Sequence, residues 1–353
     1  MNDPLLTELI EETIAEGASD LHLLPGRHPV IRVSGQLLPL VKRPILSPEE
    51  TKGFLSALLR SDDVKRFESV KEIDFSYGHK DLARFRGNAY MEKGRVAFAL
   101  RLIPRTIPTL KELHLPEILG EFTKKRQGFF LVVGPMGHGK STTLASLIEM
   151  INETRTEHIM TIEDPIEYVY EEKLSLIDQR EVRFDTATFH TGLTALFRED
   201  VNVALIGEMR ELETISSAVT AAETGHLVFS TLHTNSAAET VNRIIDSFPP
   251  SQQDQIRLQL AGSLSGVFSQ RLIPRIAGGL IPACELLVST PAVANLIREK
   301  RTHELTTVIE TGMEHGMIDM NRSLAELVRG GEVTVENALR FSTNPQLLER
   351  LLA

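Results

Sequence analysis

The stretch that most constrains this fold is Gly134-Pro135-Met136-Gly137-His138-Gly139-Lys140-Ser141-Thr142. It matches the pattern G-x-x-x-x-G-K-[ST] of a phosphate-binding loop. An apolar run, Phe129–Val133, precedes it, and residues 141–152 carry apolar side chains at helical spacing. We therefore expect a buried parallel strand before the loop and a helix after it. The glycines let backbone N–H groups turn inward around a phosphate, and the helix N-terminus adds partial positive charge.

This loop predicts ATP and Mg²⁺ as ligands, with residues 134–142 forming the nucleotide-binding site. Lys140 would contact the β- and γ-phosphates, and the Ser141 hydroxyl would ligate Mg²⁺. The alternative is a glycine-rich turn between a strand and a helix that contains a lysine by chance. The order of strand, loop, lysine, serine and helix disfavours that alternative.

Length and composition bound the class of protein. The 353 residues exceed one typical domain, so two domains are expected. A formal net charge of −10 and the absence of tryptophan argue against nucleic acid as the main partner. The single cysteine, Cys284, excludes internal disulfides and cysteine zinc sites. No signal peptide and no apolar run of membrane-spanning length is evident, so we expect a cytoplasmic protein or one held at a membrane through partners.

The domain organisation follows from the pattern of strands, helices and prolines. Residues 1–103 mix helical and alternating strand patterns, which predicts an antiparallel α+β domain. Prolines recur over residues 104–116, which we interpret as a linker. Over residues 117–290 apolar strands alternate with helices, which indicates an α/β core with a mostly parallel sheet. Residues 291–353 are predicted to be helical. The strands expected in the core are Phe129–Val133, His158–Ile162, Val203–Ile206, Leu227–Thr231 and Leu280–Val288.

Two glutamates follow predicted strands of this core. Glu208 comes after Val203–Ile206, as expected of a Walker B element, where a carboxylate holds the Mg²⁺ shell or orients water. Glu163 follows His158–Ile162, and ligands of such sheets bind outside the carboxyl ends of the strands. We therefore predict that Glu163 faces the γ-phosphate and acts as the general base. The alternative for Glu208 is a solvated acid at a strand end.

Two histidines flank the predicted strand Leu227–Thr231. His233 follows it on the same rim as the two glutamates, where it could sense the γ-phosphate. His226 precedes it and is expected to organise structure or an interface. Taken alone, each histidine is more commonly a hydrogen-bonded structural residue. No H-E-x-x-H or Cys/His spacing accompanies them, so zinc is not expected.

With these motifs identified, the chain resembles the type II/type IV secretion-superfamily ATPases (the GspE/PulE/PilT-like proteins), and most of all the PilT-type pilus retraction ATPases. The loop at residues 134–142 resembles the family's Walker A, and Thr161–Glu167 its Asp box. Residues 198–210 resemble its Walker B region, and residues 221–240 its His box. The segments Ser19–Leu23 and Asn295–Glu299 resemble the start of the N-terminal domain and the tail of the retraction subgroup.

The resemblance implies a PAS-like N-terminal domain, a RecA-like P-loop ATPase domain and a helical C-terminal region. It also implies a homohexamer in which ATP lies between one subunit's ATPase domain and a neighbour's N-terminal domain. Arg86 and Arg101 match the positions of arginines that stabilise the transferring phosphoryl group in trans, although exposed arginines on strands are common. The implied location is the cytoplasmic face of the inner membrane at the pilus base. The implied partners are the membrane platform protein and a paralogous ATPase.

The chain departs from the family pattern at several positions. Met136 and His138 stand where the family usually has threonine and serine, and Ala294 replaces an arginine of the tail. Three functions stay open: a retraction motor, another motor of the superfamily (pilus extension or type II/IV secretion), and an accessory retraction paralogue. Extension and type II secretion ATPases characteristically carry a tetracysteine metal site, which one cysteine cannot supply.

Overall fold

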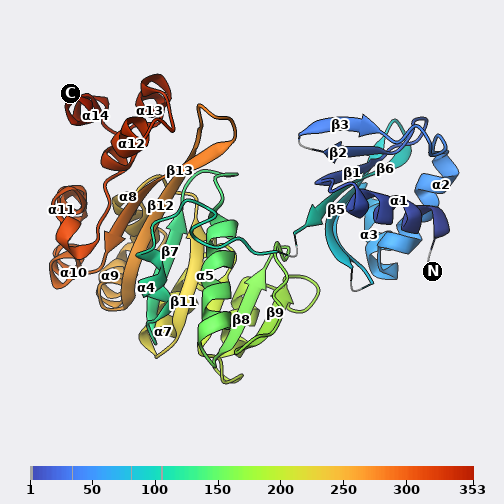
Figure 1. Cartoon of the computed structure of the whole chain (residues 1–353). Coiled ribbons are helices and arrows are strands. Elements are labelled where there is room, and N and C mark those ends of the chain that lie inside the picture. The colour runs from blue at the N-terminus through green and yellow to red at the C-terminus, as the bar shows by residue number, and fades with distance from the viewer. Residues whose placement is uncertain (1–2, 34, 81, 105) are drawn as a thin grey trace. The chain divides into compact units, whose positions relative to one another are not determined.

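The computed structural model describes residues 3–33, 35–80, 82–104 and 106–353, and the chain divides into two compact units (Figure 1). The first unit contains Met1–Thr106 and Pro165–Val169, and the second contains Ile107–Asp164 and Tyr170–Ala353. The grouping of five residues from the 160s with the first unit is not anticipated by the continuous ranges expected from the sequence. The boundaries at residues 103, 116 and 290 stay a prediction.

The first unit is an antiparallel sheet with the strand order β3-β2-β1-β6-β5-β4 and with helices α1 to α3. Side chains on β5 alternate between the core and the outer face. Helix α2 begins with a serine cap that forms a full capping box: Ser47 Oγ accepts from the Glu50 N–H, and the Glu50 carboxylate accepts from the Ser47 N–H. The elements are α1 Pro4–Ala15, β1 Asp20–Leu23, β2 Val30–Val33, β3 Gln36–Pro39, α2 Pro48–Leu58, α3 Ser61–Val70, β4 Glu72–His79, β5 Ala83–Glu92 and β6 Arg95–Ile103.

The second unit is built on a mixed, mostly parallel sheet with the strand order β13-β12-β7-β11-β10-β8-β9. The strands from β12 to β9 run parallel, and β13 pairs antiparallel with β12. The strands are β7 Gly128–Val133, β8 His158–Glu163, β9 Leu176–Glu181, β10 Val203–Ile206, β11 Leu227–Leu232, β12 Leu264–Pro274 and β13 Leu280–Val288. All five strands expected in this part of the chain are confirmed. The sequence analysis predicts neither β9 nor β12, because both carry polar residues within their runs.

Helices cover both faces of this sheet, so its central strands are buried completely. On one face, Phe129 and Leu131 of β7 share a core cluster with Ile215 of α7. On the other face, the Phe130 ring lies 4.3 Å from that of Phe122 in α4. Each such buried side chain contributes on the order of 2 kcal/mol, which makes β7 a rigid base for the loop that follows it. The helices are α4 Leu119–Thr123, α5 Lys140–Thr154, α6 Phe189–Leu196, α7 Leu212–Glu223, α8 Ala237–Asp246 and α9 Pro250–Ser263.

The C-terminal helices divide between two cores. Residues of α10 and α11 join the main cluster of the second unit, whereas α12 to α14 pack against the ends of β12 and β13 in a smaller cluster that includes Ile273 and Leu324 (Figure 1). These helices are α10 Pro291–Arg298, α11 Leu305–Thr311, α12 Met320–Arg329, α13 Val335–Phe341 and α14 Pro345–Leu352. The sequence analysis predicts the helical region, and the structure adds its connection to β12. In the described part of the chain, no helix is both long enough and apolar enough to cross a membrane.

Candidate nucleotide-binding site

The loop predicted to bind phosphate joins β7 to α5, as the motif requires. Gly134, Gly137 and Gly139 have φ angles of 144°, 77° and 81°, a region that side-chain-bearing residues rarely adopt. Gly139 is also the N-cap of α5. These three positions curl the backbone tightly at the N-terminus of α5, which is the geometry of an anion site at a helix end.

The Lys140 side chain points back toward the start of this loop. Its Nζ donates to the carbonyl oxygens of Gly134 and Pro135, each at 2.9 Å. The residue is 7% exposed. An ammonium group held by two loop carbonyls and the neighbouring His233 ring can exchange those carbonyls for phosphate oxygens.

The carboxyl ends of three neighbouring strands meet beside this loop. Glu163 ends β8, Glu208 follows β10 and His233 follows β11. In the parallel ladder, Ile162 of β8 pairs with Ile206 of β10, and Ile206 pairs with Ser230 of β11. Because β11 in turn pairs with β7, the strand before the loop, all four strand ends lie at the same edge of the sheet.

His233 lies between Lys140 of the loop and Glu208, the predicted Walker B glutamate. Its Nδ1 lies 3.3 Å from Lys140 Nζ, and its Nε2 lies 3.6 Å from a carboxylate oxygen of Glu208. An ammonium group only donates, so Nδ1 is the acceptor, and the proton of a neutral ring then sits on Nε2 and faces Glu208. Arg210 forms an ion pair with Glu208 at 2.9 Å. The structure thus brings together three residues that the sequence predicted separately.

Glu163 is buried, with 8% of its surface exposed, and its carboxylate is oriented by neighbours. Thr161 Oγ1 donates to Glu163 Oε1 at 2.7 Å, and Gln179 Nε2 of β9 lies 3.5 Å from the same oxygen. A Cβ at Gly207 would lie 3.4 Å from the Glu163 Cα, an ordinary van der Waals distance, so the segment after β10 lies directly beside Glu163. The sequence analysis missed Thr161, although its spacing of two from Glu163 places both side chains on one face of the strand.

Gln270 of β12 is a second site residue that the sequence analysis missed. It is 2% exposed, its Nε2 donates to the His138 carbonyl at 2.6 Å, and its Oε1 accepts from Thr143 Oγ1 at 2.6 Å. The Gln270 backbone also lies directly against the loop, because a Cβ at Gly134 would lie 2.4 Å from the Gln270 carbonyl oxygen. The available signal was an amide side chain between the apolar residues of Val267–Phe268 and Leu272–Ile273, since a buried amide requires hydrogen-bond partners.

His226 lies at the opposite end of β11 and makes structural contacts. Its Nδ1 is 3.0 Å from the carbonyl oxygen of Ala221 in α7, and its ring meets that of Phe197 edge to face. This arrangement agrees with the structural role expected for it.

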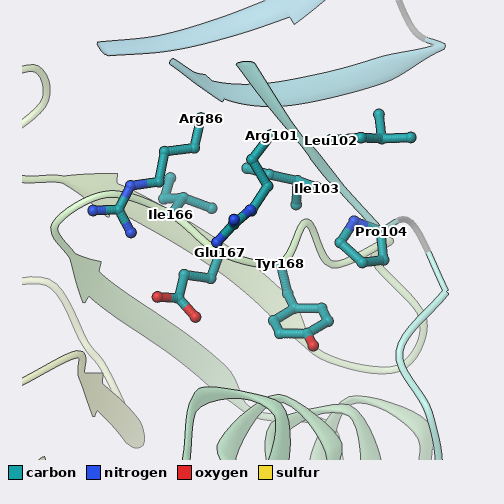
Figure 2. A pocket seen from close by; sticks show the side chains of 8 residues that line it. All are labelled: Arg86, Arg101, Leu102, Ile103, Pro104, Ile166, Glu167 and Tyr168. Carbon is teal, nitrogen blue, oxygen red and sulfur yellow. The ribbon is translucent and has the colours of Figure 1, made fainter. Parts of the chain in front are cut away.

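Arg86 and Arg101 line a pocket of about 190 Å³ in the first unit (Figure 2). They face each other across the β5–β6 ladder. Figure 2 shows both side chains extending from the strands toward the segment that carries Glu167 and Tyr168. Arg101 Nε also donates to Asp20 Oδ1 at 2.9 Å. Both guanidinium groups line this pocket together with the carboxylate-bearing Glu167, and guanidinium groups are the chemistry expected of arginines that contact phosphate.

The residues predicted to hold Mg²⁺ have the right chemistry for it. Across the described residues, no group of three or more His, Cys, Asp or Glu side chains forms a metal cage. Mg²⁺ that is bound together with nucleotide phosphates needs only one or two protein oxygens. The Ser141 hydroxyl, next to Lys140 in the first turn of α5, and the Glu208 carboxylate are such hard oxygen donors.

Comparison with known proteins places this architecture in a family. The sequence family described as "Type II/IV secretion system protein" matches residues 108–340. The chain is 42% identical to the type IV pilus retraction ATPase PilT of Pseudomonas aeruginosa over 341 residues, which cover 97% of this chain and 99% of that protein. It is 44% identical to a twitching motility protein of Neisseria gonorrhoeae over 319 residues, covering 90% of this chain and 85% of that protein.

A solved structure agrees with the sequence relatives. The crystal structure of the pilus retraction motor PilT with bound ADP superimposes with a TM-score of 0.91 at 44% identity, and the match covers 98% of this chain and 99% of that one. The family match spans well over half of the chain, and the similarity to whole relatives extends from end to end. This chain belongs to the type II/IV secretion system protein family.

Proposed function

We propose that this protein is a Mg²⁺-dependent ATPase that works as a homohexameric motor and drives retraction of type IV pili. The observation that carries the ATPase assignment is the chain of contacts from Lys140 through His233 to Glu208 beside the phosphate loop. The assignment to retraction is supported by similarity over almost the full length to relatives named for pilus retraction and twitching motility.

Nucleotide binding is the task of the loop and α5. Backbone N–H groups of residues 134–142 surround the phosphates, and the N-terminus of α5 adds partial positive charge. Lys140 exchanges the carbonyls of Gly134 and Pro135 for β- and γ-phosphate oxygens. Because His233 contacts the same ammonium group, this movement changes the His233–Glu208 contact, so His233 is placed to sense the γ-phosphate.

Hydrolysis requires a metal site and a base. Ser141 and Glu208 would hold Mg²⁺, which supplies positive charge to the phosphate oxygens when it is bound. Glu163 accepts the proton of the attacking water, and the hydrogen bond from Thr161 holds its carboxylate in a fixed orientation. Glu163 ends β8, and Glu208 lies two residues beyond the end of the adjacent β10, so base and metal ligand lie at the same edge of the sheet.

At the finer level of fold, the first unit is a PAS-like domain and the second a RecA-like domain. In the ring, Arg86 and Arg101 of one subunit stabilise the phosphoryl charge at the ATP site of a neighbour. Hydrolysis moves the domains as rigid bodies about the linker at residues 104–116. The motion acts on a platform protein of the inner membrane, and a paralogous ATPase shares the work. The motor itself is cytoplasmic and peripheral to that membrane.

The contribution of arginines in trans can be tested by mixing two inactive variants. Arg86→Ala and Glu163→Gln are each expected to hydrolyse ATP poorly. Mixed rings contain sites that combine an intact base from one subunit with an intact arginine from its neighbour, so mixing should restore activity. Specific activity of the unmodified protein should also fall on dilution below the concentration at which the ring dissociates. Absence of complementation in verified mixed rings, or full activity of a verified monomer, would contradict this arrangement.

The direction of the motor is tested by deleting the gene, counting surface pili and measuring twitching in the same cells. Abundant pili without movement are expected for loss of a retraction motor. Cells without pili would identify an extension motor instead. Normal pili with normal movement would indicate a secretion motor or an accessory paralogue.

A further inference from the structure

The phosphate loop is joined to β12 by a contact that depends on the unusual His138. Its Nδ1 accepts a hydrogen bond from the Leu272 N–H at 2.9 Å. The adjacent Gln270 side chain donates to the His138 carbonyl at 2.6 Å. Two residues of β12 two positions apart therefore bind one loop residue, Leu272 through the His138 side chain and Gln270 through the His138 backbone carbonyl.

The strand register explains why this N–H needs a partner. The ladder between β12 and β7 ends where Ser269 pairs with Val133, so β12 continues past the end of β7. The Leu272 N–H lies beyond the last residue pair of that ladder, and His138 supplies the acceptor that a longer β7 would have offered. A serine side chain is one bond too short to place an acceptor at the position of Nδ1.

We propose that His138 is a positioning residue which, together with Gln270, holds the phosphate loop in its nucleotide-binding curvature by bonding it to β12. The inference rests on the proposed nucleotide site, because it assigns a purpose to the geometry of that loop. These hydrogen bonds pre-organise the loop, so less conformational entropy is lost when the nucleotide binds. Gln270 also connects β12 to α5, because its Oε1 accepts a hydrogen bond from Thr143 Oγ1.

The contact needs a neutral imidazole ring. Burial lowers the pKa of His138 below its ordinary value of 6.5, and the positive charges of Lys140 on α5 and Arg271 on β12 lower it further. The ring is therefore neutral at pH 7, and Nδ1 carries a lone pair toward Leu272. When the pH falls through this depressed pKa, Nδ1 gains a proton and two donors face each other. The contact is thus present above that pKa and lost below it.

The test compares His138→Ala with His138→Asn in the full chain, by titrating a fluorescent ADP analogue in the presence of Mg²⁺ at pH 7.5. The alanine variant leaves the Leu272 N–H without its partner, and we expect a loss of affinity of roughly five- to tenfold. The asparagine amide oxygen occupies the position of Nδ1 and should restore affinity to within about twofold. The KM for ATP should rise in the alanine variant by more than kcat falls, as expected for an interaction made in the bound ground state.

Two results would overturn the proposal. One is unchanged affinity in His138→Ala; the other is an asparagine variant that binds as weakly as the alanine variant. His315→Ala, which removes an exposed histidine elsewhere in the second unit, is the matched control and should bind like the unmodified protein.

A pH series separates this role from simple packing. The ratio of the dissociation constants of the unmodified protein and His138→Asn should rise as the pH is lowered from 8 toward 5.5, because asparagine does not titrate. Ionisation of the nucleotide cancels in this ratio. A constant ratio over the whole range would show that His138 does not act as a neutral acceptor.

Lys140→Ala distinguishes failure of this inference from failure of the nucleotide site itself. If Lys140→Ala abolishes binding while His138→Ala leaves it unchanged, the site stands and the positioning role is wrong. If neither substitution alters affinity, the loop is not the nucleotide site, and both proposals fail.

Discussion

Replacing Glu163 by glutamine is expected to leave ATP bound while lowering its hydrolysis by roughly 10²- to 10⁴-fold, the usual contribution of a general base. The amide has the shape of the carboxylate, and its oxygen still accepts the Thr161 hydrogen bond, so the site should keep its geometry. It cannot accept a proton from water at neutral pH. We therefore expect the affinity for ATP to stay near that of the unmodified protein while the rate of hydrolysis falls.

The measurement is a single-turnover assay with preloaded Mg-ATP, beside equilibrium binding of the same nucleotide. Glu172→Gln removes the charge of an exposed glutamate elsewhere in the second unit and is the matched control, with turnover expected to stay normal. Turnover near the unmodified rate in Glu163→Gln would move the base to another group, and Glu208 would be the first to examine.

Replacing Lys140 by alanine should abolish tight nucleotide binding, with a loss of affinity on the order of a hundredfold or more, because charge-assisted bonds to phosphate are among the strongest polar contacts. Lys140 is the only lysine or arginine in residues 134–142. The substitution also leaves the carbonyls of Gly134 and Pro135 without the ammonium group that now bridges them.

This prediction is checked by calorimetric titration with ADP and with ATP. Lys140→Met keeps most of the apolar stem and removes only the charge, so it should lose affinity to a similar degree. Lys124→Ala changes an exposed lysine that pairs with Glu121 and should have no effect. Normal affinity in both Lys140 variants would mean that the phosphates bind elsewhere.

Local patterns predicted much of the fold because they report local physics. The apolar run Phe129–Val133 predicts a buried strand because only a strand covered on both faces tolerates such a run. The capping box at Ser47 and Glu50 is likewise a local feature, because a serine followed by proline and two acids is a typical helix start. The loop at residues 134–142 was identified because its glycines and lysine stand in a single short segment.

Contacts between distant segments could not be predicted in this way. The sequence pattern does not predict β12, because Ser269 and Gln270 interrupt its apolar residues. Both polar side chains are buried because other segments supply their hydrogen-bond partners. Gln270 and His138 are 132 residues apart in sequence. The hydrophobic periodicity of these two segments does not indicate that β12 pairs with β7.

The sequence by itself determined that a strand, a phosphate loop and a helix follow one another, and that acids end two of the strands. Only the tertiary structure decided that His233 lies between Lys140 and Glu208 and that His138 accepts from Leu272. The physical reason is that side-chain periodicity records which face of an element is buried, whereas the order of strands in the sheet, which sets distances between their ends, depends on packing among all of them.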